Sequence, residues 1–173
     1  MITIDITDLK ILTELVENAK TSNVEIGKKL RIHPNVVAYR INKLENGGII
    51  KEYTTVLDLD KLGLTEQMYV GASLPKNSER DDILRQVAEI PQTVSVISSL
   101  GSPESIVFLV GKNKDEVDKV MSKLRNLNLK IKYTSPIIKT YDNGNMRNYL
   151  SLLTQERNEE ILNKTPKEAS KIV

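Results

Sequence analysis

Cysteine is absent from this sequence of 173 residues, which excludes disulfide bonds, thiolate metal sites and a cysteine nucleophile. Tryptophan is absent as well, and aromatic residues make up only 4% of the chain, so any packed core must be mainly aliphatic. No apolar run approaches the length of a membrane span, and the first residues lack the basic patch and apolar core of a secretory signal. We therefore expect a soluble cytoplasmic protein with no membrane partner.

Patterns that bind cofactors or carry out catalysis are missing too. His33 is the only histidine, and no group of Asp, Glu and His residues has the spacing of metal ligands. No glycine-rich phosphate-binding loop is present. The sequence thus predicts neither an enzyme nor a bound cofactor or metal ion.

Residues 21–51 have the pattern of two short helices joined by a tight turn. Ser22, followed by Glu25 three residues later, forms a capping box at the start of the first helix. Pro34 takes the first position of the second helix, where its missing N–H group costs nothing, and Gly48 follows the end of that helix. This arrangement is typical of a helix-turn-helix, in which the second helix reads DNA.

The predicted recognition helix has one apolar and one polar side. Three residues at spacings i, i+4 and i+7 form the apolar side: Val37, Ile41 and Leu44. On the other side, Asn35, Tyr39 and Asn42 are the candidates for base contacts, because Asn pairs with adenine and Tyr reaches phosphates or thymine methyl groups. The full set of residues predicted to bind DNA is His33, Asn35, Val36, Ala38, Tyr39, Arg40, Asn42 and Lys43.

Two roles within this set stay open. Lys43 and Arg40 are placed for phosphate contacts, although Arg40 could instead make an internal ion pair. His33 could touch a phosphate, but a cap on the recognition helix is the simpler account of its position.

A further helix over residues 5–19 is expected to pack across the pair and complete a three-helix domain. Its apolar face is predicted to consist of Leu9, Leu12, Val16 and Ala19, widened by Ile11 and Leu15.

Positive charge is concentrated on the helix pair. Residues 20–51 hold seven basic and two acidic side chains, a net charge of +5, whereas residues 1–19 hold one basic and four acidic ones, a net charge of −3. The whole chain carries only +2, so the excess is local, as expected of a phosphate-binding surface. Two short helices also occur as plain packing units, and a basic face can simply be solvated.

From residue 66 onward the apolar residues alternate. Strands are predicted at 68–74, 94–100, 106–110 and 129–133, and helices at 78–90 and 114–127. The order β-α-β-β-α-β is that of a ferredoxin-like fold, so the whole chain is expected to be of the α+β class. Helices cover one face of such a sheet, and the open face predicts a homodimer. Cover by residues 141–173 is the alternative.

These observations divide the chain into four parts. We predict a helix-turn-helix domain at 1–51, a linker strand and hinge at 52–65, a βαββαβ dimerisation domain at 66–140, and a C-terminal extension at 141–173. The extension is expected to be partly helical, from Met146 to about Asn163.

Four stretches of this sequence carry a family pattern. They are Asp5-x-x-Asp8-Leu-Lys-Ile-Leu12, the segment from Ser22 to Leu30, Pro34-x-x-Val37-x-x-Arg40-Ile-x-Lys-Leu-Glu45, and Gly48-Ile-Ile-Lys-x-Tyr53. Together they resemble the leucine-responsive regulatory protein/AsnC family of transcription regulators. The resemblance covers about residues 5–140 and implies a winged-helix-like DNA reader, a linker strand, and a βαββαβ domain that dimerises and often assembles into octamers.

The resemblance also implies an effector site, because many members sense amino acids at contacts between dimers. The family's Gly-x-Tyr-Asp loop corresponds here to Gly101-Ser-Pro-Glu104, which keeps the glycine and lacks the Tyr-Asp. Glu104 could pair with an ammonium group, or the segment could be a tight turn with a solvated carboxylate. The residues that the resemblance assigns to this site are Leu100, Gly101, Ser102, Pro103, Glu104, Thr134 and Ser135.

The favoured function is a sequence-specific, DNA-binding transcription regulator that is at least dimeric and modulated by a small molecule such as a free amino acid. The first alternative is an architectural protein that wraps double-stranded DNA with little sequence preference and a steep salt dependence. The second is a small-molecule sensor or assembly module without DNA binding. The recognition face is polar rather than purely basic, which favours the sequence-specific regulator over the architectural protein.

Overall fold

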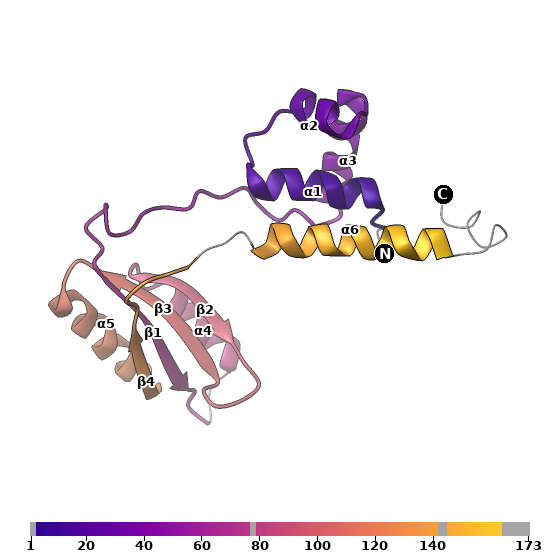
Figure 1. Ribbon diagram of the computed structural model, residues 1–173. Helices are drawn as coiled ribbons and strands as arrows, with labels where there is room; N and C mark the ends of the chain where they lie inside the picture. Colours follow the sequence, from indigo (N-terminus) through magenta and orange to yellow (C-terminus); the bar gives the residue numbers. More distant parts are fainter. Residues whose placement is uncertain (1–2, 77–78, 142–144, 164–173) are drawn as a thin grey trace. The chain divides into compact units, whose positions relative to one another are not determined.

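The computed structural model describes residues 3–76, 79–141 and 145–163 (Figure 1). They fall into two compact units. The helical unit contains Met1–Thr55 and Tyr141–Val173, and the sheet unit contains Val56–Thr140. The chain therefore leaves the helical unit and later returns to it. No helix within the described ranges is both long and apolar enough to cross a bilayer.

Four described helices form the helical unit: α1 (Ile6–Glu17), α2 (Asn23–Leu30), α3 (Pro34–Asn46) and α6 (Asn145–Asn163). The predicted helix-turn-helix is confirmed as α2 and α3, and α1 contacts both. The helix predicted in the C-terminal extension is confirmed as α6, which lies alongside α1 (Figure 1). Residues 164–173 of that extension lie outside the described ranges.

The local signals at the helix ends act as the sequence predicts. Ser22 Oγ accepts a hydrogen bond from the N–H of Glu25 at 3.2 Å, and Glu25 Oε2 accepts one from the N–H of Ser22 at 2.8 Å. At the end of α3, Gly48 adopts a left-handed backbone with φ of +69°. This allows the N–H of Ile49 to donate to the carbonyl of Leu44 at 2.9 Å, which completes a glycine-based C-cap.

The core of the helical unit is aliphatic and contains Ile11, Leu15, Ile26, Val37 and Ile41. The predicted apolar face of α1 is partly wrong, because Val16 and Ala19 are exposed while Asp8 is fully buried. Asp8, Ile11 and Leu15 lie on the same side of α1. A hydrophobicity pattern cannot identify this buried side, because one of its residues is Asp8, a charged residue that ion pairs make tolerable in the core.

The sheet unit has the predicted element order: β1 (Glu66–Ser73), α4 (Arg80–Ala88), β2 (Thr93–Ser98), β3 (Ser105–Gly111), α5 (Lys114–Asn126) and β4 (Lys130–Pro136). The strands form one antiparallel sheet in the order β2-β3-β1-β4. Figure 1 shows α4 and α5 on one side of this sheet. The ferredoxin-like fold and the α+β class are therefore confirmed.

One face of the sheet packs against α4 and α5, and the other is open. The core between them contains the buried residues Val70, Ala72, Val107 and Leu109 of the sheet and Val87, Val120 and Leu124 of the helices. On the open face the rings of Tyr69 and Phe108 lie 5.2 Å apart, and the ring of Tyr133 covers Gly71. A Cβ atom at Gly71 would come within 2.3 Å of that ring, so this glycine makes room for an aromatic cover.

Residues 52–65 depart from the prediction of a linker strand. Residues 51–58 have no regular secondary structure, and 59–63 form turns. Val56 is 88% exposed and Leu57 is 59% exposed. Their β-branched and apolar composition favours an extended backbone, but a strand also needs a hydrogen-bonded neighbour, and no described strand pairs with this segment.

Candidate nucleic-acid interface

The outward side of α3 carries a continuous polar stripe. Asn35, Tyr39, Asn42 and Asn46 follow one another at spacings of three and four residues, and all four are exposed. Residues at these spacings share a helix face, and 71% of the surface of Tyr39 is exposed. Val36 borders the stripe and is also exposed. Asn46 was not among the predicted residues, although its spacing would have identified it.

The turn before α3 is fixed by its own side chains. His33 accepts a hydrogen bond at Nδ1 from the N–H of Asn35 at 3.2 Å and has the extended backbone of an N-cap residue. The cap reading of His33 is thus confirmed. Arg31 closes α2 with a left-handed backbone, with φ of +58°, and its side chain is exposed.

Gly27 allows α2 to approach the turn closely. This residue is buried, and a Cβ atom on it would lie 2.8 Å from the carbonyl oxygen of Ile32 and 3.4 Å from the nitrogen of Pro34. A side chain would therefore push the start of α3 away from α2.

Arg40 and Lys43 take part in an ion-pair network that joins α3 to α1. The Arg40 guanidinium contacts Asp5 Oδ2 at 2.5 Å and Asp8 Oδ1 at 2.9 Å. Lys43 Nζ contacts Asp8 Oδ2 at 3.2 Å and donates to the carbonyl oxygen of Thr3 at 2.9 Å. Asp8 is completely buried, so this network replaces hydration that its carboxylate has lost.

The electrostatics of the network follow from this pairing. Burial alone raises the pKa of Asp5, but the hydrogen bond and charge of Arg40, with the N–H of Asp8, outweigh it and hold that pKa below its ordinary value. The hydrogen bond to Asp5 is the main cause that raises the pKa of Arg40 above its usual value. Both shifts favour the charged forms, so the ion pair persists at neutral pH.

These contacts involve two residues of the predicted site, whose part in DNA binding stays a prediction. The internal ion pair, which the sequence left open for Arg40, is the arrangement found. Lys43, predicted as a phosphate contact, is engaged in the same network and is only partly exposed. Ala38 is half-buried at the edge of the polar stripe. The pairing joins residues more than 30 positions apart, which a helical pattern cannot indicate.

Other cationic side chains of the helical unit are exposed and could contact phosphates. Lys29 is bound to Glu14 at 2.5 Å, but Lys28 and Arg31 are exposed and form no ion pair within the described ranges. Both lie at the end of α2 next to the turn that leads into α3. Both residues contribute to the positive charge counted from the sequence, but no contact could be predicted for them, because their orientation depends on the left-handed turn at Arg31.

Tyr53 fastens the segment after α3 to the recognition helix. Its hydroxyl donates to Glu45 Oε1 at 2.8 Å. Burial, the hydrogen bond and the Glu45 charge together raise the pKa of Tyr53 to about 12. The contact limits the movement of the chain where it leaves the helix-turn-helix.

In the sheet unit, the turn between β2 and β3 is held by two side chains. Arg80 donates to Ser98 Oγ at 2.9 Å, to the Glu104 carbonyl at 2.8 Å, and to the Ser99 carbonyl. Glu104 Oε2 accepts a hydrogen bond from the N–H of Leu74 at 3.0 Å. The carboxylate therefore binds the end of β1 through one oxygen, rather than being simply solvated.

The predicted effector residues do not all come together within one chain. Gly101, Ser102, Pro103 and Glu104 lie in the β2–β3 turn with Leu100, which is fully exposed. Thr134 and Ser135 are on β4, and β1 and β3 separate them from β2. They pair with Val70 and Tyr69, whereas the turn is next to the Ala72 end of β1. Thr134 and Ser135 therefore do not face this turn in the same protomer.

A cavity of about 840 Å³ lies beside the turn, lined by Ser73, Leu74, Pro75, Lys76, Arg80, Glu104, Asn128, Lys130 and Lys132. Four of these side chains are cationic and one is anionic, which makes the lining positive. Across the part of the chain that the structure describes, no group of three or more His, Asp and Glu residues could hold a metal ion.

Comparisons with known proteins agree with this geometry. A family model described as winged helix-turn-helix DNA-binding matches residues 4–51. Transcriptional regulator AzlB of Bacillus subtilis is 32% identical over 116 residues, which are 66% of this chain and 74% of AzlB.

Solved structures extend the similarity over both units. LrpC of Bacillus subtilis is 26% identical with a TM-score of 0.72, and the match covers 82% of this chain and 99% of LrpC. A transcriptional regulator of Neisseria meningitidis in complex with L-Met has a TM-score of 0.73 at 23% identity, covering 82% of this chain and 94% of that one. With its helix-turn-helix and ferredoxin-like units in the same order, this chain belongs to the leucine-responsive regulatory protein/AsnC family of transcription regulators.

Proposed function

We propose that this transcription regulator binds DNA in a sequence-specific manner and that α3 reads the bases. The observation that supports this most is the exposed stripe of Asn35, Tyr39, Asn42 and Asn46. Amides read hydrogen-bond donors and acceptors on base edges in the major groove, whereas lysines and arginines alone would bind any phosphate backbone. The two cations closest to this stripe in sequence are occupied by Asp5 and Asp8, which leaves the amides to determine recognition.

Phosphate contacts are assigned to Lys28 and Arg31 in place of Arg40 and Lys43. Both side chains are exposed beside the turn. A cation at this position would fix the register of α3 on the duplex without adding sequence preference.

The test is selection of bound duplexes from random DNA, followed by binding measurements on the selected duplex. Tyr39→Ala or Asn42→Ala should weaken binding to that duplex by roughly 1–3 kcal/mol and leave binding to random DNA unchanged. Lys28→Ala should weaken both alike and reduce the salt slope by about 1. Equal loss on both DNAs for Tyr39→Ala and Asn42→Ala would exclude base reading, and selection without enrichment would favour the architectural alternative.

A homodimer formed through the open sheet face completes the proposal. Tyr69, Ile97 and Tyr133 are between 40% and 50% exposed there, which is an unusual density of large apolar side chains for a solvated sheet. A dimer of this kind, alone or within an octamer, would read two half-sites about one helical turn apart in a pseudo-palindrome. Light scattering of the wild type and of Tyr133→Lys tests it, since a monomer in both would contradict the dimer.

A small-molecule effector is part of the same proposal. The Neisseria meningitidis relative binds L-Met, and the β2–β3 turn of this chain borders a cavity with a positive lining. The carboxylate of Glu104 suits an ammonium group, and Lys130 and Lys132 suit a carboxylate. Repeating the selection with each free amino acid would identify the effector by a change in affinity. The action of such a regulator on DNA implies a cytoplasmic location.

A further inference from the structure

The segment before α1 connects two helices that are far apart in sequence. We call residues 3–5 the N-terminal arm. Lys43 of α3 binds the Thr3 carbonyl at 2.9 Å, and Arg40 of α3 binds Asp5 at 2.5 Å. Between them, the Ile4 carbonyl accepts a hydrogen bond from the Arg157 guanidinium of α6. Three consecutive residues of the arm are thus held alternately by the recognition helix and by the C-terminal helix.

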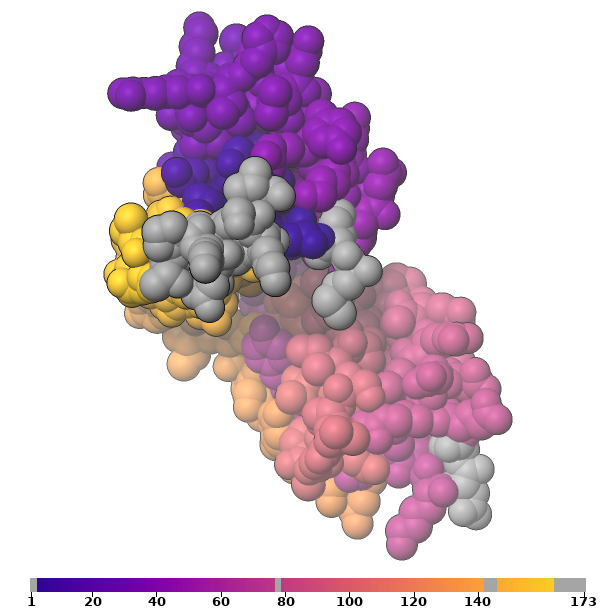
Figure 2. Space-filling view, turned by 90° about the vertical axis from the view of Figure 1, so that its right-hand side faces the viewer, coloured from indigo at the N-terminus to yellow at the C-terminus, as the bar shows by residue number. Residues whose placement is uncertain are grey.

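Helix α6 lies alongside α1 and extends beyond its N-terminal end (Figure 1). Leu150 and Thr154 are buried on the inner side of α6, and Arg157 is half-buried one turn further on. Near the other end, Arg147 contacts Glu17 at 3.2 Å. Since Glu17 ends α1 and Ile4 precedes it, these contacts make α6 antiparallel to α1. Figure 2 shows the orange and yellow surface of α6 next to the indigo surface of α1.

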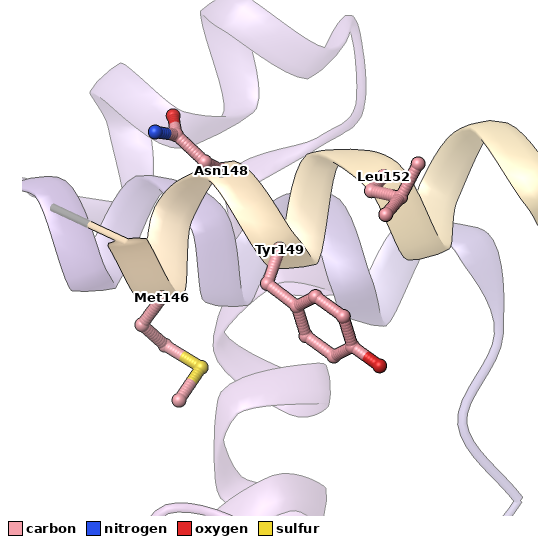
Figure 3. A pocket seen from close by; sticks show the side chains of 4 residues that line it. All are labelled: Met146, Asn148, Tyr149 and Leu152. Carbon is pink, nitrogen blue, oxygen red and sulfur yellow. The ribbon is translucent and has the colours of Figure 1, made fainter.

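The outer side of α6 differs from the inner side. Met146 and Tyr149 project in one direction from the first turns of the helix (Figure 3). They are 60% and 58% exposed.

We propose that Arg157 is a positioning residue for DNA recognition: it fixes the N-terminal arm, which in turn holds Arg40 and Lys43 and thereby sets the placement of α3. The inference rests on the proposed DNA-binding function. It gives a role to the C-terminal extension, which lies beyond the part of the sequence that resembles the family. Without Arg157, the Ile4 carbonyl loses this partner, and the arm keeps its contacts to α3 and to Asp8 of α1.

The consequence for DNA binding follows from the population of the correctly placed recognition helix. When the competent state is only a fraction of the molecules, the measured Kd rises by the inverse of that fraction. An arm that is detached for half to nine tenths of the time would raise the Kd about two- to tenfold. Arg40 and Lys43 would keep Asp8 as a partner, so α3 would stay folded while its orientation became less well defined.

The experiment compares Arg157→Ala, Arg157→Lys and Arg147→Ala in the full chain, on the duplex selected from random DNA. Arg157→Ala is expected to raise the Kd about two- to tenfold. Arg157→Lys should recover most of the affinity that Arg157→Ala loses, because the Ile4 carbonyl needs only one hydrogen-bond donor and the lysine ammonium group provides one. Arg147→Ala removes an exposed ion pair of the same helix without touching the arm, and its Kd should stay within twofold of the wild type.

A second readout separates positioning from a general loosening of α6. Hydrogen exchange should become faster at residues 3–9 and in α3 of Arg157→Ala, and stay unchanged around Leu150. In a double-mutant cycle, Lys43→Ala should add less to Arg157→Ala than it costs alone, because both act through the arm. An unchanged Kd of Arg157→Ala, or equal effects of Arg157→Ala and Arg147→Ala on the Kd, would overturn the proposal.

The two proposals can fail independently. If the wild type binds no DNA, the proposed function is wrong, and the exchange of α3 still decides whether Arg157 positions it. If the wild type selects a duplex and Arg157→Ala binds that duplex equally well, the DNA-binding function stands and the positioning role is wrong.

Discussion

Substitution of Asp8 tests the ion-pair network directly. Its side chain is completely buried, with Oδ1 at 2.9 Å from Arg40 and Oδ2 at 3.2 Å from Lys43. Oδ2 also accepts a hydrogen bond from the N–H of Asp5 at 3.1 Å, as part of a capping box for α1. Asp8→Ala removes all three interactions and leaves Arg40 with only Asp5, and Lys43 with only the Thr3 carbonyl, of the contacts described above.

The loss of stability caused by Asp8→Ala can be estimated from these contacts. Removing one partner of a buried ion pair typically costs about 3–5 kcal/mol, and losing the one hydrogen bond that Asp8 contributes to the capping box costs about 1 kcal/mol. The side chains of Arg40 and Lys43 are 24% and 31% exposed, so water can recover part of their hydration. We therefore expect Asp8→Ala to lower the free energy of opening of the helical unit by about 2–4 kcal/mol.

Native-state hydrogen exchange is the suitable assay, because a chain with two units need not unfold in a single step. The amides of α1 and α3 should lose protection in Asp8→Ala while those of the sheet unit do not. Glu14→Ala, which breaks the more exposed pair with Lys29, serves as the matched control and should cost less than about 1 kcal/mol. A change below about 0.5 kcal/mol in Asp8→Ala would refute the role of the buried carboxylate.

Three further predictions concern single contacts. Gly27→Ala should destabilise the helical unit by about 1–3 kcal/mol in thermal unfolding, because the added Cβ overpacks the turn; an unchanged or higher melting temperature would contradict this. The pKa of Asp5 is lowered on folding, so its stabilisation is present above pH 4 and lost as the pH falls through the folded-state pKa; Asp5→Asn should flatten that acid dependence. The pKa of Tyr53 rises to about 12, so its contribution is present below about pH 10 and lost as the pH rises through 12. Alkaline unfolding of Tyr53→Phe that matches the wild type would exclude that contact.

The helix-turn-helix could be predicted because its signals are local. The capping box at Ser22, the proline at the start of α3 and the left-handed Gly48 each act within a few residues. The same holds for the alternating strands of the sheet unit, whose order alone defined the fold. In both cases a pattern in one segment determines the structure of that segment.

The ion pairs and the docking of α6 could not be predicted in this way. Arg40 meets Asp8 across 32 positions, and Arg157 meets Ile4 across 153. Such contacts depend on the packing of whole elements. From the sequence alone, a charged residue on a helix is expected to be solvated, because its partner is not known. Asp8 shows the same limit, since its burial depends on cations supplied by another helix. The missing linker strand has a related cause, because pairing requires a neighbour that no local pattern provides.

The return of the chain to the helical unit has a consequence for biosynthesis. A ribosome makes α1, α2 and α3 first, then the whole sheet unit, and only afterwards α6, which docks back on α1. Domains fold as they emerge during synthesis, so α1 must wait with its α6-binding side uncovered while the whole chain between Glu17 and Asn145 is added. Nascent chains arrested after β4 should therefore expose an apolar surface that chaperones recognise, and release of α6 from the ribosome would end that exposure.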